Sequence, residues 1–184
     1  MDRELVELAQ AGDREAFAVL ARASADRMFA IAHRILKDIG RAEDAVQQTL
    51  VIAWRQLPGL RDPDRFDAWI YRLLVNACHS EAREARRWGT FLQVLPADGP
   101  VARDETMSVA DRDQLDRGFR RLPAEQRAVL VLRHYLGLST HEIAELLGVP
   151  EGTARSRLHY AHRAMRAALE AAERSVPAIG GRSS

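Results

Sequence analysis

Apolar residues recur at every third or fourth position along most of this chain, which is the spacing of helices that bury one face. No segment alternates between apolar and polar residues as a half-buried strand does. Glycines, prolines and capping residues divide the pattern into segments. The first part of the chain is predicted to form helices over residues 4–10, 13–37, 41–57 and 65–87. The last part is predicted to form helices over residues 109–121, 123–135, 140–147 and 151–173.

Residues 89–108 differ from both parts, because they contain two Pro and two Gly and show no sustained period. A structureless stretch of this length inside a compact domain is unusual, so it is interpreted as a linker. The chain is therefore predicted to be all-α, with small helical domains at residues 1–88 and 109–175 joined by a flexible linker. Residues 176–184 are predicted to be a disordered tail.

Composition excludes several classes of protein. The 184 residues are 47% apolar, which is too high a fraction for a disordered chain. No run of 18 apolar residues is present, and the N-terminus lacks the apolar core of a signal peptide. Cys78 is the single cysteine, so the chain has no thiol pair for an internal disulfide or a zinc knuckle. We therefore expect a cytoplasmic protein without a cofactor or a metal.

The charged residues are distributed unevenly along the chain, although the net charge is close to zero. The chain has 26 Arg, one Lys and a net charge of +1, and a GC-rich coding sequence would explain the number of arginines. Residues 1–80 hold 11 basic and 12 acidic side chains, whereas residues 109–184 hold 12 and 9. Residues 152–169 contain four Arg, two His and no acidic side chain. A local basic stripe of this kind is typical of a surface that contacts nucleic-acid phosphates.

The helices predicted at residues 140–147 and 151–173 have the pattern of a helix-turn-helix. Ser139 and Glu142 form a capping-box motif, and a short turn containing Gly148 separates the two helices. The second helix has an apolar stripe on the side toward the first, so that an ordinary amphipathic surface helix is the less favoured alternative. Its opposite side and edges carry Arg155, Ser156, Arg157, His159, Tyr160 and Arg163.

Two helices in the first part of the chain also carry candidate binding residues. Around residues 41–57 the exposed side includes Val51 and Ile52, which indicates either a partner surface or contact with a second helix of the same chain. In the helix at residues 65–87, Asn76 lies on a polar side, and amides and hydroxyls there suit the reading of unpaired bases. A helix–helix hydrogen bond is the alternative role for Asn76.

Several of these segments resemble a known family. Residues 41–54 (RAEDAVQQTLVIAW) and 66–76 (FDAWIYRLLVN) resemble region 2 of bacterial sigma-70 factors, specifically the extracytoplasmic-function (ECF) group. Residues 122–132 and 139–165 resemble region 4 of the same group. Both motifs stand in the order of the family with a linker between them.

The resemblance implies an RNA polymerase promoter-specificity subunit that is not itself an enzyme, has no cofactor, and is regulated by an anti-sigma factor. The contacts with the clamp coiled coil of the largest polymerase subunit would be Asp44, Gln47, Gln48, Val51 and Trp54. The residues at the −10 element would be Arg61, Asp62, Phe66, Asn76 and Ser80, with Phe66 and the preceding loop holding an extruded base. The −35 base contacts would be Arg155, Ser156, His159 and Tyr160, and the phosphate contacts Ser139, Thr140, Thr153, Arg157 and Arg163.

The chain departs from the family pattern on the recognition helix. Ala154 stands where a β-branched residue is common, and His159 and Tyr160 stand where an aromatic residue is often followed by Arg. These differences would give an atypical or weaker −35 contact.

Other classes of protein fit the sequence less well. A stand-alone two-domain regulator would explain the helix-turn-helix but has no reason to carry residues 41–76. An enzyme is disfavoured by the lack of a glycine-rich phosphate loop, a nucleophile elbow or paired carboxylates. His159 and His162 have the spacing of two metal ligands, but no carboxylate or thiol lies near them in sequence to complete a site. The sequence leaves open whether the two domains pack together.

Overall fold

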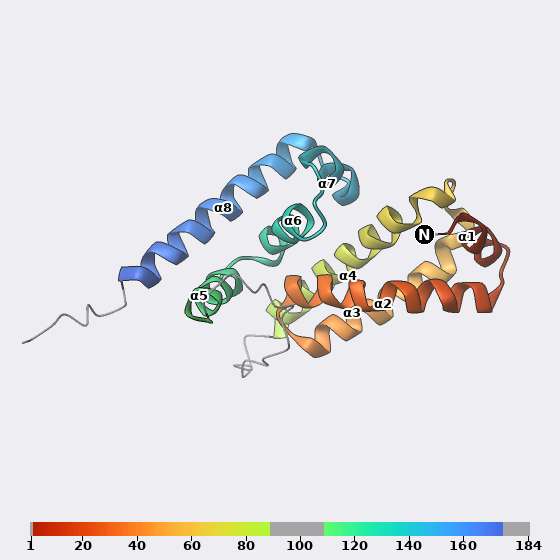
Figure 1. Ribbon diagram of the computed structural model, residues 1–184, viewed down its shortest axis with the longest axis horizontal. Coiled ribbons are helices and arrows are strands. Elements are labelled where there is room, and N and C mark those ends of the chain that lie inside the picture. Colours follow the sequence, from red (N-terminus) through yellow and green to blue (C-terminus); the bar gives the residue numbers. More distant parts are fainter. Residues whose placement is uncertain (1, 89–108, 175–184) are drawn as a thin grey trace, which may run out of the picture.

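The computed structural model describes residues 2–88 and 109–174, so the predicted linker and tail lie outside the described part (Figure 1). The described residues form helices and contain no strand, which confirms the all-α prediction. The elements are α1 Arg3–Gln10, α2 Arg14–Leu36, α3 Ile39–Gln56, η1 Leu57–Gly59, η2 Pro63–Arg65, α4 Phe66–Trp88, α5 Val109–Arg120, α6 Ala124–His134, α7 Thr140–Leu147 and α8 Glu151–Arg174. We call α1–α4 the N-terminal bundle and α5–α8 the C-terminal unit.

Capping residues set most helix boundaries where the sequence predicts them. The side chain of Asp13 accepts hydrogen bonds from two backbone N–H groups at the start of α2. Two boundaries were predicted wrongly. Asp38 caps α3, so the helix begins at Ile39 and includes Gly40, which the sequence pattern had treated as a break. Pro123 is the N-cap of α6 rather than its first helical residue.

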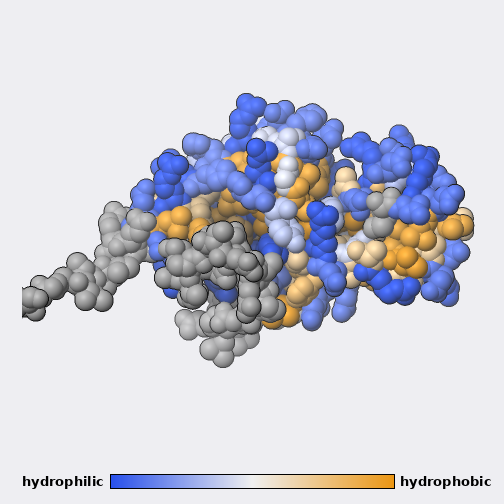
Figure 2. All heavy atoms as spheres, viewed as in Figure 1, coloured by the Kyte–Doolittle hydropathy of each residue, from blue (hydrophilic) through white to orange (hydrophobic). Residues whose placement is uncertain are grey.

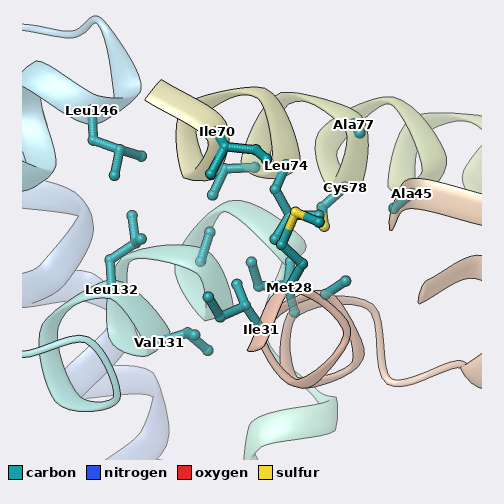
Figure 3. Close-up of a cluster of buried hydrophobic side chains, with 14 of the residues drawn as sticks. Met28, Ile31, Ala45, Ile70, Leu74, Ala77, Cys78, Val131, Leu132 and Leu146 are labelled. Carbon is teal, nitrogen blue, oxygen red and sulfur yellow. The ribbon is translucent and has the colours of Figure 1, made fainter. Parts of the chain in front are cut away.

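The C-terminal unit packs on the N-terminal bundle through a shared apolar core (Figure 3). Val131 and Leu132 of α6, together with Leu146 of α7, lie in the same buried cluster as Ile31 of α2 and Ile70 of α4. All five are less than one-tenth exposed. The two halves of the molecule are therefore closed on one another, which answers the question that the sequence left open.

Arg127 of α6 joins the end of α2 at this junction. Its Nε donates a hydrogen bond to the carbonyl oxygen of Ile35, and its Nη1 donates to the carbonyl oxygen of Leu122 at 2.7 Å and to that of Arg120 at 3.3 Å. Burial lowers the pKa of Arg127 to about 10, so the guanidinium remains charged at neutral pH. The positive charge lies at the C-terminus of α2, where the helix dipole is negative.

Lys37 forms a second polar connection between the halves. It ends α2 in the left-handed conformation, with φ of 59°. Its ammonium group pairs with the carboxylate of Asp116 in α5 and lies 5.0 Å from the ring centre of Phe119. Burial opposes ionisation of Asp116, but hydrogen bonds from Lys37 and Arg120 outweigh it and lower the pKa of Asp116.

The rim of the junction carries exposed charged pairs. Arg65 of η2 lies 3.3 Å from Glu145 of α7, and both side chains are more than half exposed. Arg34 lies 4.1 Å from the ring centre of Tyr135, a cation–π contact. On the face shown in Figure 2, hydrophilic side chains surround apolar patches on both halves of the molecule.

Candidate promoter-binding surfaces

The candidate −35 surface is the exposed side of α8, the second helix of the helix-turn-helix. Ala154, Leu158 and Ala161 are buried, and α8 packs on both α6 and α7. Ser139 and Glu142 form the predicted capping box of α7, and Gly148 ends that helix with φ of 64°. The apolar side of α8 is therefore buried against α6 and α7. The predicted base contacts Arg155, Ser156, His159 and Tyr160 are all exposed.

Each of the four predicted base contacts has a neighbour that restricts it. Nη2 of Arg155 donates to Oε1 of Glu151 at 2.8 Å. The hydroxyl of Ser156 donates to the carbonyl oxygen of Thr153 at 3.0 Å. The rings of His159 and its neighbour Tyr160 meet edge to face with centroids 5.7 Å apart, and Tyr160 is 56% exposed. An aromatic pair and a guanidinium side by side suit base edges and the thymine methyl group.

The predicted phosphate contacts are placed less uniformly. Arg163 is exposed, whereas Thr140 and Thr153 are half-buried. The hydroxyl of Ser139 accepts a hydrogen bond from the backbone N–H of Glu142, so it serves first as a helix cap. Arg157 is half-buried near α4, and its charge adds to the effect of burial in lowering the pKa of His79.

The predicted −10 residues lie at η2 and along α4. Arg61 and Asp62 are exposed, and Oδ1 of Asp62 caps η2 by accepting from the backbone N–H of Asp64. Gln10 of α1 donates to the carbonyl oxygen of Leu60 at 2.6 Å and so holds the loop on the bundle. Phe66 is only 1% exposed, so its ring is not accessible to an extruded base in this arrangement, contrary to the role predicted for it.

Asn76 and Ser80 complete the predicted −10 set further along α4. Asn76 is exposed, and its side chain makes no hydrogen bond to the described residues, which leaves its helix–helix alternative without support. Ser80 is half-buried. Sequence reasoning had placed both residues on the polar side of the helix.

A groove of roughly 750 Å³ lies between η2, α4 and α7. Trp69, Tyr71 and Arg72 line it from α4, and Leu138 and Glu145 line it from the C-terminal unit. At Gly148 an added Cβ would lie 3.2 Å from Nη2 of Arg72, so the turn of the helix-turn-helix touches α4 directly. The candidate −10 surface is therefore partly covered by the C-terminal unit.

The candidate polymerase surface is the outer side of α3. Asp44, Gln47 and Gln48 are exposed, and Val51 is 51% exposed. Trp54 is half-buried, with its ring edge to face against Phe17 at 5.1 Å between centroids. No described helix covers Val51, which favours the partner surface over the intramolecular contact for this residue.

Sequence reasoning missed a histidine pair between α6 and α8. Nε2 of His134 and Nε2 of His162 lie 3.0 Å apart. Burial, followed by the neighbouring His134, lowers the pKa of His162. The pairing depends on how α6 and α8 pack, so no local sequence signal could have revealed it. Within the described residues, no three His, Cys, Asp or Glu side chains are grouped to hold a metal ion.

Cys78 lies in the core of the N-terminal bundle. Burial raises the pKa of its thiol to about 12, which disfavours the reactive thiolate. Among the described helices, none is long and apolar enough to span a bilayer.

Family models match both halves of the chain. The model of sigma-70 region 2 matches residues 20–88, and the model of sigma-70 region 4 matches residues 112–167. The ECF RNA polymerase sigma factor SigL of Mycobacterium tuberculosis is 37% identical over 173 residues, which cover 86% of this chain and 94% of that protein. The chain belongs to the ECF sigma factors of the sigma-70 family. The match to region 2 decides against a stand-alone regulator.

Other relatives also match this sigma factor over most of its length and of their own. SigW of Bacillus subtilis is 26% identical over 92% of this chain and 97% of its own length. CnrH, solved in complex with the cytosolic domain of CnrY, is 28% identical with a TM-score of 0.64 over 92% of this chain and 97% of its own. The sigma factor RpoE of Bartonella quintana, solved with the anti-sigma factor NepR, shares the fold with a TM-score of 0.63 at 23% identity, over 85% of this chain and 96% of its own.

Proposed function

We propose that this sigma factor binds core RNA polymerase through α3, recognises the −35 element with α8, and binds and melts the −10 element with the η2 loop and α4. The polymerase carries the catalytic chemistry, so the sigma factor is not itself an enzyme, and it acts in the cytoplasm with the polymerase. The observation that carries the proposal is the division of α8: one stripe is buried, and the opposite stripe is exposed and able to donate hydrogen bonds. That exposed stripe comprises Arg155, Ser156, His159 and Tyr160.

Promoter binding requires the two halves to separate. The two promoter elements lie roughly 25 base pairs apart, about 85 Å along B-DNA. In the closed arrangement α7 lies against α4, and the turn at Gly148 lies beside the side chain of Arg72. A single promoter could not reach both reading surfaces in this form. We infer that the structure is the closed form and that binding to the polymerase opens it.

An anti-sigma factor is the proposed regulator. CnrH and RpoE were each solved with a bound partner, and for RpoE that partner is an anti-sigma factor. Both folds match this chain across the N-terminal bundle and the C-terminal unit. A partner that binds across the two halves would favour the closed form by mass action.

The test is to mix the purified full chain with bacterial core RNA polymerase and to follow co-elution on a sizing column. The complex is then used to select promoters from a library in which the −35 and −10 positions vary. We expect a stable complex and selection of one sequence at each element. A folded chain, free of any copurified inhibitor, that fails to bind the polymerase would contradict the proposal.

A further inference from the structure

The first turn of α8 carries a carboxylate beside the residues that would contact the −35 element. Glu151 is the first residue of α8, and its side chain is 44% exposed. One oxygen accepts the hydrogen bond from Arg155 at 2.8 Å, and the other lies 3.6 Å from Nδ1 of His141 in α7. A carboxylate at this place repels the phosphates that the surrounding arginines attract.

The contact with Arg155 has the (i, i+4) spacing that stabilises a helix, and it also fixes the position of the guanidinium. A negative charge in the first turn stabilises a helix through its dipole whether or not it touches an arginine. Here the carboxylate accepts from one N–H of Nη2, and Nη1 and Nε have no hydrogen-bond partner among the described residues. The second N–H of Nη2 therefore still forms a two-donor edge with one of these neighbouring nitrogens. A guanidinium presents its N–H groups as a planar fork, and two of them match O6 and N7 of guanine.

We propose that Glu151 is a positioning residue that directs Arg155 to base edges and away from phosphates. The inference rests on the proposed function, in which Arg155 reads the −35 element. An unrestrained arginine reaches the nearest phosphate and strengthens binding to every sequence alike. An arginine held by a neighbouring carboxylate binds phosphates less well. The carboxylate would approach the DNA backbone together with the guanidinium, and the phosphates would repel it. Glu151 therefore sets sequence preference at the expense of affinity for random DNA.

The experiment measures DNA binding by the holoenzyme assembled from core polymerase and the full chain. Four forms are compared: the wild type, Glu151→Gln, Arg155→Ala and the double variant. Glu170→Gln is the matched control, since it removes the same charge from the exposed surface of the same helix. The probes are a duplex with the selected −35 element, a set with each base pair of that element changed, and a random duplex, all at one salt concentration.

We expect Glu151→Gln to bind random DNA about three- to tenfold more tightly and to lose about five- to tenfold of its discrimination at one base pair. Arg155→Ala should lose discrimination at that same base pair. The double variant should discriminate at that base pair as poorly as Arg155→Ala does, with no further loss. Glu170→Gln should discriminate as the wild type does.

Two outcomes overturn the inference alone. In one, the wild type discriminates and Glu151→Gln discriminates equally well. In the other, Glu151→Gln weakens binding to all duplexes together, as a frayed helix would. A wild-type holoenzyme that bound the polymerase but preferred no −35 sequence would overturn the proposed function, and the inference with it.

Discussion

The C-terminal unit carries arginines on two faces, and the structure holds them in different ways. On the face toward the N-terminal bundle, Arg127 is half-buried and donates to three carbonyl oxygens. On the exposed side of α8, Arg155 has a side chain that is 75% exposed and pairs, among the described residues, with Glu151 alone. A charged group that is partly removed from water needs hydrogen bonds with the protein to offset the cost of desolvation. An exposed charged group keeps its water and can replace it with a ligand. Exposure and number of partners thus distinguish Arg127, which joins the two halves, from Arg155, which is proposed to bind DNA.

The largest effect is expected for Arg127→Ala, which removes the arginine that donates to three carbonyl oxygens at the junction of the two halves. The carbonyl oxygens of Ile35 and Leu122 would lose their donor, and we expect the free energy of unfolding to fall by about 2–4 kcal/mol. Urea denaturation followed by circular dichroism measures it. The control is Arg121→Ala, an exposed residue of the same unit, which should cost less than about 0.5 kcal/mol. Equal losses in the two variants would contradict the assignment of Arg127 as a closing residue.

A smaller effect is expected for Val51→Asp on the exposed side of α3. This side chain is 51% exposed, so the substitution should leave folding intact while it weakens binding to core polymerase by about tenfold or more. Competition binding with labelled wild-type protein measures the change. Leu8→Asp is the matched control, because Leu8 is 53% exposed on α1, outside the proposed contact. If both variants bound alike, α3 would not be the polymerase surface.

Acidification should destabilise the folded protein through His79. Burial lowers the pKa of this imidazole below its usual 6.5, and Arg157 and Arg83 add to the effect against the opposing charge of Glu125. As the pH falls below 6.5, the unfolded chain takes up a proton at this position before the folded chain does. The unfolded state then holds more protons, so the free energy of unfolding falls as the pH falls.

The measurement is urea denaturation at about pH 7.5 and about pH 5.5, on either side of the usual histidine pKa. The decline in stability should be smaller in His79→Gln than in the wild type. Part of it should remain, because burial also lowers the pKa values of His33 and His162. An unchanged decline in the variant would show that His79 does not contribute.

The smallest effect is expected at the rim of the junction. Arg65 and Glu145 are 63% and 52% exposed, and exposed ion pairs contribute between 0 and about 1 kcal/mol. A double-mutant cycle with Arg65→Ala and Glu145→Ala should give a coupling energy below about 0.5 kcal/mol. A larger value would place this pair among the contacts that close the molecule.

The sequence predicted well what depends on neighbours along the chain. Asp13 and Ser139 cap their helices as expected, and the buried stripe of α8 follows the apolar spacing. The exposed positions of Arg155 and Asn76 follow from the same periodicity. The start of α3 was misjudged because the low helix propensity of Gly40 was given more weight than the cap at Asp38.

Contacts between distant parts of the chain could not be predicted. Arg127 and Ile35 are 92 residues apart, and nothing near either residue indicates the other. Val131 and Leu132 sit in an apolar run that would serve equally well inside an isolated C-terminal unit. Only the packed structure shows that they belong to a core shared with the N-terminal bundle. The burial of Phe66 is likewise a property of the assembled bundle.

Lys37 gives this sigma factor a chemical reporter of its own state. It is the single lysine of the chain, and its side chain is 13% exposed at the junction of the two halves. Amine-reactive reagents would therefore have one side-chain target, shielded while Asp116 and Phe119 cover it. Faster acylation at this position would report separation of the halves without any introduced label. Mass spectrometry of one peptide would then follow opening in the native protein, alone or with a partner.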